Sequence, residues 1–149
     1  MKIHKLICTI FGVGYIKGGG TIAAFVCCVC WFFAAKYRCD NKLFLIATLL
    51  ITAIGIWSAT KVETIWGKDS YRVVIDEVAG MAIGLLFVPV QLKYIVTAFI
   101  LFRFFDILKP LFIRRLEKLP AGWGVMADDL LAGIYTNIIM QIIIINNFF

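Results

Sequence analysis

The sequence predicts an all-α integral membrane protein: a helical bundle of about four to five short transmembrane helices in one domain, residues 1–149. Of the 149 residues, 62% are apolar and 16% charged, whereas soluble domains carry about 25% charged residues. The mean hydropathy is +0.96. Charged residues also divide the chain into uncharged stretches close to the length of a membrane span. A chain this short has no room to bury so much apolar surface in a water-soluble core.

Residues 1–17 are the first element. The basic start, Met1 to Lys5, and the apolar residues 6–16 resemble the beginning of a signal peptide. No convincing small-residue cleavage site follows, and another apolar run begins at once. We therefore expect an N-terminal segment that lies at the membrane interface.

Five apolar stretches follow, at residues 18–35, 43–60, 78–92, 94–108 and 130–149. A span needs about 20 apolar residues, so the second and the last stretches are the clearest spans. The first begins with three glycines. The third, which contains Pro89, and the fourth, which contains Arg103 and Asp106, are short. We expect these two to be tilted or shielded by their neighbours.

The basic residues define an orientation. With five spans, eleven of the 15 Lys and Arg residues fall on one side of the membrane and four on the other. The positive-inside rule makes the side with eleven charges cytoplasmic. These residues flank apolar stretches and form no basic stripe, which argues against nucleic acid as a partner. The membrane bilayer is the expected partner, and the sequence leaves the oligomeric state open.

The cysteines and the single histidine argue against zinc and disulfide chemistry. The chain has five cysteines, an odd number, and Cys27, Cys28 and Cys30 lie within an apolar run, where thiols behave as small apolar groups. His4 is at the start of the chain. A structural zinc site or a disulfide framework is therefore not expected.

Five acidic residues are the candidate catalytic groups. Asp76, Glu77, Asp106, Asp128 and Asp129 all fall at the predicted cytoplasmic ends of spans. Ionisable groups near membrane depth are costly and usually mark a functional site. Gathered at one interface they would repel each other, and a divalent metal would neutralise them. Oxygen ligands without His or Cys favour Mg²⁺ over other metals.

Each motif also has a simpler interpretation. The pairs Asp76-Glu77 and Asp128-Asp129 each precede an apolar helix and would stabilise its N-terminus as caps. Arg103 and Asp106 are spaced i, i+3 and would form a surface ion pair. The glycines at 18–20 would form a flexible linker.

Basic residues and glycines near the acids point to a phosphate. Arg103 can bind a phosphate bidentately, and Lys109 adds a point charge shortly before Pro110 ends the helix. The glycine-rich residues 12–21 can offer backbone N–H groups to phosphate oxygens. The chain lacks a second histidine, a cysteine–phosphate loop, an Asp-x-Asp pair and a GxxxxGK[ST] motif. With these enzyme classes excluded, the reaction that the residues still allow is metal-assisted attack of water on a phosphomonoester.

Four motifs in this order resemble the phosphatidylglycerophosphatase A family. They are Gly12-Val-Gly with Gly20-Thr21, Ile75-Asp-Glu-Val-Ala-Gly80, Phe102-Arg-Phe-Phe-Asp-Ile-Leu-Lys-Pro110 and Gly124-Val-Met-Ala-Asp-Asp-Leu-Leu-Ala-Gly133. The resemblance covers about residues 10–24 and 72–140. It implies a Mg²⁺-dependent phosphatase that converts phosphatidylglycerol phosphate to phosphatidylglycerol and phosphate, in the bacterial cytoplasmic (inner) membrane with its active site facing the cytoplasm.

The resemblance also implies roles for nine residues. The catalytic acids are Asp76, Glu77, Asp106, Asp128 and Asp129. We expect the metal, or its water, to be held by all of these except Asp106, which is either a ligand or an orienting partner. The substrate phosphate would be bound by Arg103, Lys109, Gly20 and Thr21.

The first loop departs from the family pattern. The family usually has Pro-Gly-Thr followed by Gly-Ser, whereas this chain reads Gly19-Gly20-Thr21-Ile22-Ala23. The proline and the serine hydroxyl are missing, which bears on phosphate contact and substrate preference. Two alternative functions stay open: a component of a small ion-coupled transporter, or a catalytically inactive membrane scaffold. The small residues Gly80, Gly84, Ala132 and Gly133 would allow close helix packing.

Overall fold

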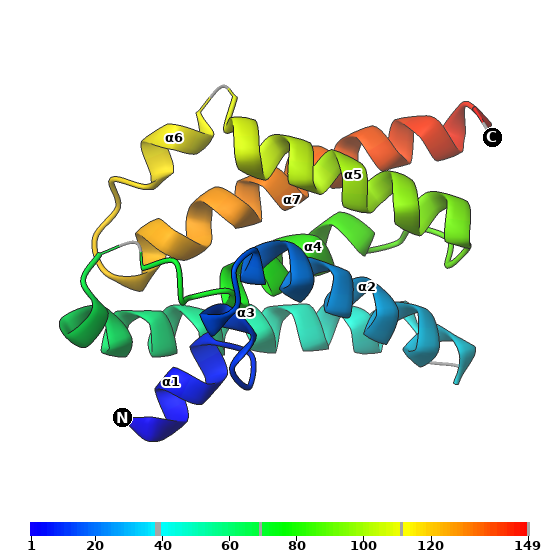
Figure 1. Cartoon of the computed structure of the whole chain (residues 1–149). Helices are drawn as coiled ribbons and strands as arrows, with labels where there is room; N and C mark the ends of the chain where they lie inside the picture. Colours follow the sequence, from blue (N-terminus) through cyan, green and yellow to red (C-terminus); the bar gives the residue numbers. More distant parts are fainter. Residues whose placement is uncertain (38–39, 69, 111, 149) are drawn as a thin grey trace.

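The computed structural model describes residues 1–37, 40–68, 70–110 and 112–148, and this part of the chain is helical without strands (Figure 1). Arg38 and Cys39, counted above among the basic residues and cysteines, lie outside the described residues. The elements, in chain order, are α1 (Lys2–Cys8), a 3-10 helix η1 (Val13–Tyr15), α2 (Gly19–Lys36), α3 (Asn41–Trp66), α4 (Ile75–Leu85), α5 (Leu92–Leu108), α6 (Ile113–Leu116) and α7 (Gly122–Ile145).

Among the described residues, three helices are long and apolar enough to cross a membrane: α2, α3 and α7. They correspond to the first, second and last predicted stretches. The all-α membrane bundle is thus confirmed, with three candidate spans by length and composition where the sequence predicts about four to five. Helix α4 has 11 residues and α5 has 17. At 1.5 Å per residue α4 is only about 16 Å long, roughly half the thickness of the hydrocarbon core.

The third stretch is divided because the chain turns before Pro89. Helix α4 ends at Leu85, and Phe87 has a φ of 60°. Proline has no N–H and cannot continue a helix. The side-chain amide of Asn137, on α7, donates to the carbonyls of Ile83 and Leu86 at 3.0 and 2.7 Å. The carbonyls freed at the end of α4 are therefore satisfied inside the protein.

The short helix α4 is shielded, as expected for a short apolar stretch. It packs against α7, α2, α3 and α5, and Figure 1 shows it in the middle of the bundle. Ala79, Met81, Ala82 and Leu85 are buried. Since its neighbours cover it, α4 does not need the length of a lipid-facing span.

Glycines bring α4 and α7 into close contact. A Cβ on Gly133 would overlap the Gly80 carbonyl, and a Cβ on Gly80 would overlap the carbonyl of Asp129. A Cβ on Gly84 would lie 3.1 Å from the Thr136 side chain. The predicted role in close packing is thus confirmed for Gly80, Gly84 and Gly133.

The N-terminal segment packs against the bundle. In α1, the His4 ring lies 3.2 Å from the hydroxyl of Ser58 on α3 and meets Trp57 edge-on. The Val74 amide donates to the Cys8 carbonyl at 2.8 Å, which ties this segment to the start of α4. The interfacial position of residues 1–17 stays a prediction.

The chain direction brings four distant segments to one end of the bundle. Helices α2, α4 and α7 begin at the end where α5 finishes (Figure 1). The acids of α4 and α7, the basic residues of α5 and the glycines before α2 meet there.

Candidate active site

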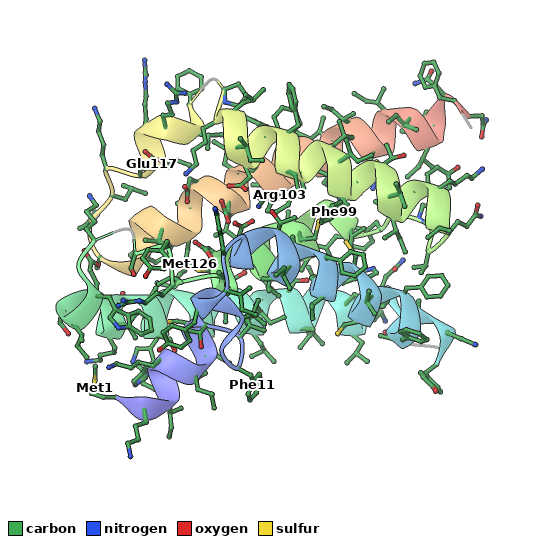
Figure 2. All side chains as sticks on the ribbon, in the orientation of Figure 1. Met1, Phe11, Phe99, Arg103, Glu117 and Met126 are labelled. Carbon is green, nitrogen blue, oxygen red and sulfur yellow. The ribbon has the colours of Figure 1, made fainter. Side chains whose placement is uncertain are left out.

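A polar cavity of about 580 Å³ opens at this end of the bundle. Its walls come from residues 15–21, 70–77, 103–109 and 128–129. All nine predicted site residues line it: Gly20, Thr21, Asp76, Glu77, Arg103, Asp106, Lys109, Asp128 and Asp129. Figure 2 shows polar side chains gathered around Arg103 between α2, α4 and α7.

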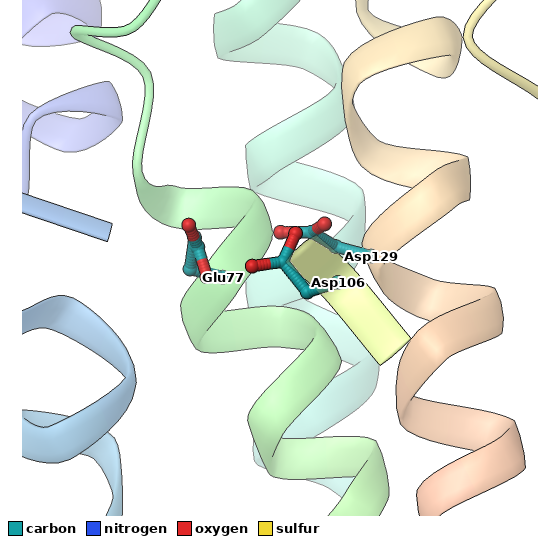
Figure 3. A group of neighbouring side chains, drawn as sticks. All are labelled: Glu77, Asp106 and Asp129. Carbon is teal, nitrogen blue, oxygen red and sulfur yellow. The ribbon is translucent and has the colours of Figure 1, made fainter. Parts of the chain in front are cut away.

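Three of the acids form a compact group. One carboxylate oxygen from each of Glu77, Asp106 and Asp129 lies within 4.8 Å of the others, and the three come from α4, α5 and α7 (Figure 3). This group contains two of the four predicted metal ligands. Its third member is Asp106, for which the sequence left a choice between ligand and orienting partner. Asp76 and Asp128 line the same cavity beside the group.

Arg103 bridges two members of this group. Its guanidinium pairs with the Glu77 carboxylate and, at 2.5 Å, with Asp106 one turn further along α5. The i, i+3 ion pair expected from the sequence therefore forms. It is not a surface pair, because the Arg103 and Asp106 side chains are only 16% and 10% exposed. Burial makes such a pair costly unless every charge has a partner.

Lys109 holds a second pair of acids. Helix α5 ends at Leu108, and Lys109 follows with a φ of 46°. Its ammonium lies 2.6 Å from both Asp128 and Glu117. Burial lowers the pKa of Lys109, but the bonds to these carboxylates outweigh that effect and keep its pKa above the usual value. Lys109 is therefore a cation at physiological pH.

Neither acid pair supplies the N-cap residue of its helix, but the α4 pair lies in the first turn and the α7 pair does not. Asp76 and Glu77 lie in the first turn of α4, where the helix dipole favours negative charge. The Glu77 amide donates to the Asp76 carboxylate at 3.0 Å. Asp128 and Asp129, in contrast, lie well inside α7, which begins at Gly122. They cannot cap it, so that interpretation is wrong for this pair.

Burial and mutual repulsion change the acidity of the α4 pair. Burial raises the pKa of Asp76 well above its usual value, and repulsion from Glu77 and Asp128 raises it further. Burial also raises the pKa of Glu77, to about 7, with repulsion from Asp106 added and attraction to Arg103 opposing it. The carboxylates therefore carry unfavourable charge that a bound cation would relieve.

Gly18, Gly19 and Gly20 line the cavity at the start of α2 and do not form a flexible linker. Gly18 precedes α2 with a φ of 79°, a conformation that glycine adopts without strain. Gly19 and Gly20 form the first turn of α2. A Cβ on Gly20 would overlap the carboxylate of Glu77. Glycine at this position thus lets the start of α2 lie directly against an acid of the compact group.

Several residues that line the cavity or pair with one of its side chains were not among the predicted set. Tyr15, Ser70 and Tyr71 line the cavity. Glu117, which pairs with Lys109, follows α6 in the short segment between Pro110 and α7. No motif marks these four residues, because tyrosine, serine and glutamate are common near membrane surfaces. Lys17, which directly precedes the three glycines, also lines the cavity.

The donor set fits a hard divalent cation. Carboxylate oxygens are the ligands that Mg²⁺ prefers, and three helices supply them at one point. In the part of the chain that the structure describes, the Oδ1 atom of Asp128 and the Nε atom of Arg103 are buried without a hydrogen-bond partner. A buried polar atom without a partner is costly, so a ligand that bonds to either atom would relieve that cost. The Asp128 oxygen suits a cation or its water, and the Arg103 N–H group suits an anion.

The fold and the cavity define a class: a helical membrane protein whose polar site offers acids to a cation and bases to an anion. The chain belongs to the phosphatidylglycerophosphatase A family, whose model matches residues 6–144. This confirms the family resemblance stated above and extends it over most of the chain. The protein is therefore a phosphatase of phospholipid metabolism with membrane helices.

Three curated relatives support this assignment. A Bacteroides thetaiotaomicron protein named "Putative phosphatidylinositol-3-phosphatase" is 40% identical over 95% of this chain and 96% of its own length. The phosphatidylglycerophosphatase A of Haemophilus influenzae is 44% identical over 66% of this chain and 63% of its own length. The Escherichia coli protein of the same name is 30% identical over 62% of this chain and 56% of its own length. No solved structure matches the chain significantly.

Proposed function

We propose that this protein is a Mg²⁺-dependent phosphatase that hydrolyses phosphatidylglycerol phosphate to phosphatidylglycerol and inorganic phosphate. The observation that carries the proposal is the convergence of Glu77, Asp106 and Asp129 from three helices at one point, beside two basic side chains. A phosphomonoester carries up to two negative charges. It would enter this cavity only together with a cation that neutralises the acids.

The residues divide into two groups by their surroundings. Glu77, Asp106 and Asp129 would hold Mg²⁺ directly, while Asp76 and Asp128 would bind its waters. When bound, the ion would supply positive charge at the phosphate oxygens and lower the pKa of a water. This assignment changes the sequence-based set by adding Asp106 as a ligand.

Arg103 and Lys109 would bind the phosphate. Each is now paired with carboxylates of the site. Once a cation neutralises these acids, both basic groups can turn toward an anion without leaving a buried carboxylate unpaired. The backbone of Gly20 and the hydroxyl of Thr21 would add donors at the start of α2.

Hydrolysis requires a water and a proton acceptor. A water oxygen attacks phosphorus, the bond from phosphorus to the ester oxygen breaks, and the released alkoxide takes a proton. Asp128, whose Oδ1 atom has no partner, is placed to accept the proton of the attacking water. The products are a lipid with a free hydroxyl group and inorganic phosphate.

Phosphatidylinositol 3-phosphate is a second candidate substrate. The relative that aligns over 95% of this chain carries the name of a phosphatase for that lipid. The first loop of this chain also lacks the proline and serine typical of the phosphatidylglycerophosphatase A pattern. Both lipids present a phosphomonoester on a polyol headgroup, so the same chemistry applies to either.

Phosphate release by the detergent-purified protein tests the proposal. Phosphatidylglycerol phosphate, phosphatidylinositol 3-phosphate and phosphatidic acid would each be supplied with Mg²⁺ or with EDTA. We expect Mg²⁺-dependent release, fastest from phosphatidylglycerol phosphate. Faster release from phosphatidylinositol 3-phosphate than from phosphatidylglycerol phosphate would identify the inositol lipid as the substrate. Release from no lipid by folded protein would contradict the proposed activity and favour the scaffold or transporter alternatives.

The proposal includes a cytoplasmic active site in the bacterial inner membrane. Lys61, Lys68 and Lys118 lie toward the cavity end of the bundle, and Lys42 and Lys93 lie toward the other end. The positive-inside rule then orients the cavity toward the cytoplasm. Cysteines introduced at Lys118 and Lys93 should differ in labelling by a membrane-impermeant maleimide on intact cells, with only position 93 labelled.

A further inference from the structure

An apolar groove runs along the bundle between α2 and α5. It has a volume of about 280 Å³, and its lining is almost entirely apolar. Its residues are Phe25, Cys28, Val29, Phe32, Phe33, Leu92, Ile95, Val96 and Phe99. Several of them are exposed, among them Phe25, Phe33 and Val96, so the groove is open along one side. Along α2 it extends about 12 Å, from Phe25 to Phe33.

The groove continues the walls of the cavity. On α2, Thr21 lines the cavity, and Phe25, Val29 and Phe33 follow at intervals of four residues on the same helix face. On α5, Arg103 lines the cavity, and Phe99 lies one turn before it (Figure 2). The same two helices therefore contribute polar groups to the site and, further along, apolar groups to the groove.

An aromatic pair lies at the end of the groove nearer the cavity. The rings of Phe25 and Phe99 meet edge-on with their centroids 6.2 Å apart. The lining thus changes along one path from charged side chains in the cavity, through this aromatic pair, to wholly apolar side chains further along the groove. A phospholipid has the same order of parts, from phosphate through glycerol to acyl chain.

A second apolar groove offers a comparison. It lies between α2 and α3, has a volume of about 310 Å³ and is lined by Val26, Trp31, Phe44 and neighbouring residues. Ile10 of the N-terminal segment and Val78 and Ala82 of α4 also line it. Among the described residues, α3 contributes none to the polar cavity. Of the two grooves, the one between α2 and α5 is thus the one whose two helices both line the cavity further along.

We propose that the groove between α2 and α5 binds one acyl chain of the lipid substrate while the phosphomonoester occupies the cavity. This inference rests on the proposed function. It makes the groove the part of the enzyme that distinguishes a membrane lipid from a water-soluble phosphate ester. Binding of a remote apolar chain contributes to the position of the phosphate at the reacting groups.

Two matched substitutions on α2 test the inference. Val29 and Val26 lie three residues apart and are 38% and 37% exposed, but Val29 lines the groove beside α5 and Val26 the one beside α3. Val29→Trp and Val26→Trp would be assayed with dipalmitoyl and dibutanoyl phosphatidylglycerol phosphate in the same detergent micelles. The two substrates share a headgroup and differ only in chain length.

We expect Val29→Trp to lower kcat/KM for the long-chain lipid about tenfold or more, since a filled pocket discriminates at that scale. It should leave kcat/KM for the short-chain lipid within about twofold, and Val26→Trp should change neither by more than about twofold. If Val29→Trp does not fold, Val96→Trp fills the same groove from α5.

Equal effects of the two tryptophans on the long-chain lipid would overturn the inference and leave the proposed function standing. An equal loss of both substrates in folded Val29→Trp would also overturn it, because the groove would then act only through the structure of the site. Hydrolysis of neither lipid by the wild-type protein would contradict the proposed function itself, and the inference with it.

Discussion

The contact between α4 and α7 and the cavity at its end are built by the same two helices with opposite chemistry. In the contact, Gly80, Gly84 and Gly133 allow one helix to approach the other without intervening side chains. One turn nearer the start of each helix, Glu77 and Asp129 place carboxylates in the cavity. One region is uncharged and closely packed, and the other is rich in charge and open.

The difference shows how this fold supports a costly site. Five buried or half-buried carboxylates repel each other and cannot hold two helices together. The close contact at the glycines holds α4 against α7. Because Glu77 lies three residues before Gly80 on α4, the position of this contact also determines where the acids meet. We therefore expect the contact to contribute mainly to stability and the cavity mainly to activity. Substitutions in the two regions should therefore have different effects.

The largest effect on activity should come from Asp129→Asn. The substitution removes one carboxylate of the compact group and keeps its size, so kcat/KM should fall at least about 100-fold through lost metal binding. Thermal unfolding in EDTA should occur at the same or a higher temperature than in the wild-type protein, because repulsion among the buried acids decreases.

The matched control is Asp40→Asn, an exposed residue that caps α3 at the opposite end of the bundle. Asparagine also caps helices well, so activity and stability should stay close to wild type. Full activity of Asp129→Asn would contradict the metal assignment at that residue.

Gly20→Ala should have the next largest effect on activity. The added Cβ would overlap the Glu77 carboxylate, and that side chain must then move away from the compact group. We expect activity to fall by about tenfold to 100-fold, comparable to the loss of a supporting contact around a metal. The Mg²⁺ concentration at half-maximal activity should rise, and the unfolding temperature should change little. An unchanged Mg²⁺ dependence would show that the start of α2 does not position Glu77.

Gly133→Ala should act on stability first. Its Cβ would overlap the backbone carbonyl of Gly80, which cannot rotate away, so we expect the free energy of unfolding to fall by about 1–3 kcal/mol. At Gly84 the Cβ would lie 3.1 Å from the Thr136 side chain, which needs to shift only slightly. Gly84→Ala should therefore cost less than about 1 kcal/mol.

Unfolding of both variants in mixed detergent micelles, followed by circular dichroism, measures the difference. If the two alanines destabilise the protein equally, close backbone contact at Gly133 is not what holds α4 against α7.

The smallest effect should come from Glu117→Gln. Glu117 is 37% exposed and shares Lys109 with Asp128, which is 5% exposed. Exposed ion pairs contribute little, so activity should change by about twofold or less. Asp128→Asn removes the buried partner of the same lysine and should reduce phosphate release much more. A larger loss in Glu117→Gln than in Asp128→Asn would reverse the order of importance assigned to the two acids.

Much of the fold was predictable because a helix that crosses the lipid bilayer needs a long stretch of uncharged, apolar residues. Stretches 43–60 and 130–149 are uncharged, and both lie largely in the long helices α3 and α7. The division between α4 and α5 was less predictable. Pro89 indicates a turn, but the depth at which a short helix ends depends on neighbours such as Asn137, which bonds the last carbonyls of α4.

The sequence by itself determined the class of protein and the residue types of the site. Its hydropathy and charge pattern placed Asp76, Asp106 and Asp129 at one end of the bundle, because alternate helix directions bring those segments to the same side. Only the tertiary structure decided which acids meet. Asp106 joins Glu77 and Asp129, whereas Asp128 turns to Lys109. Which acids meet depends on how each helix is rotated about its axis and on the close approach of α4 and α7 at their glycines. Neither of these follows from the spacing of residues along the chain.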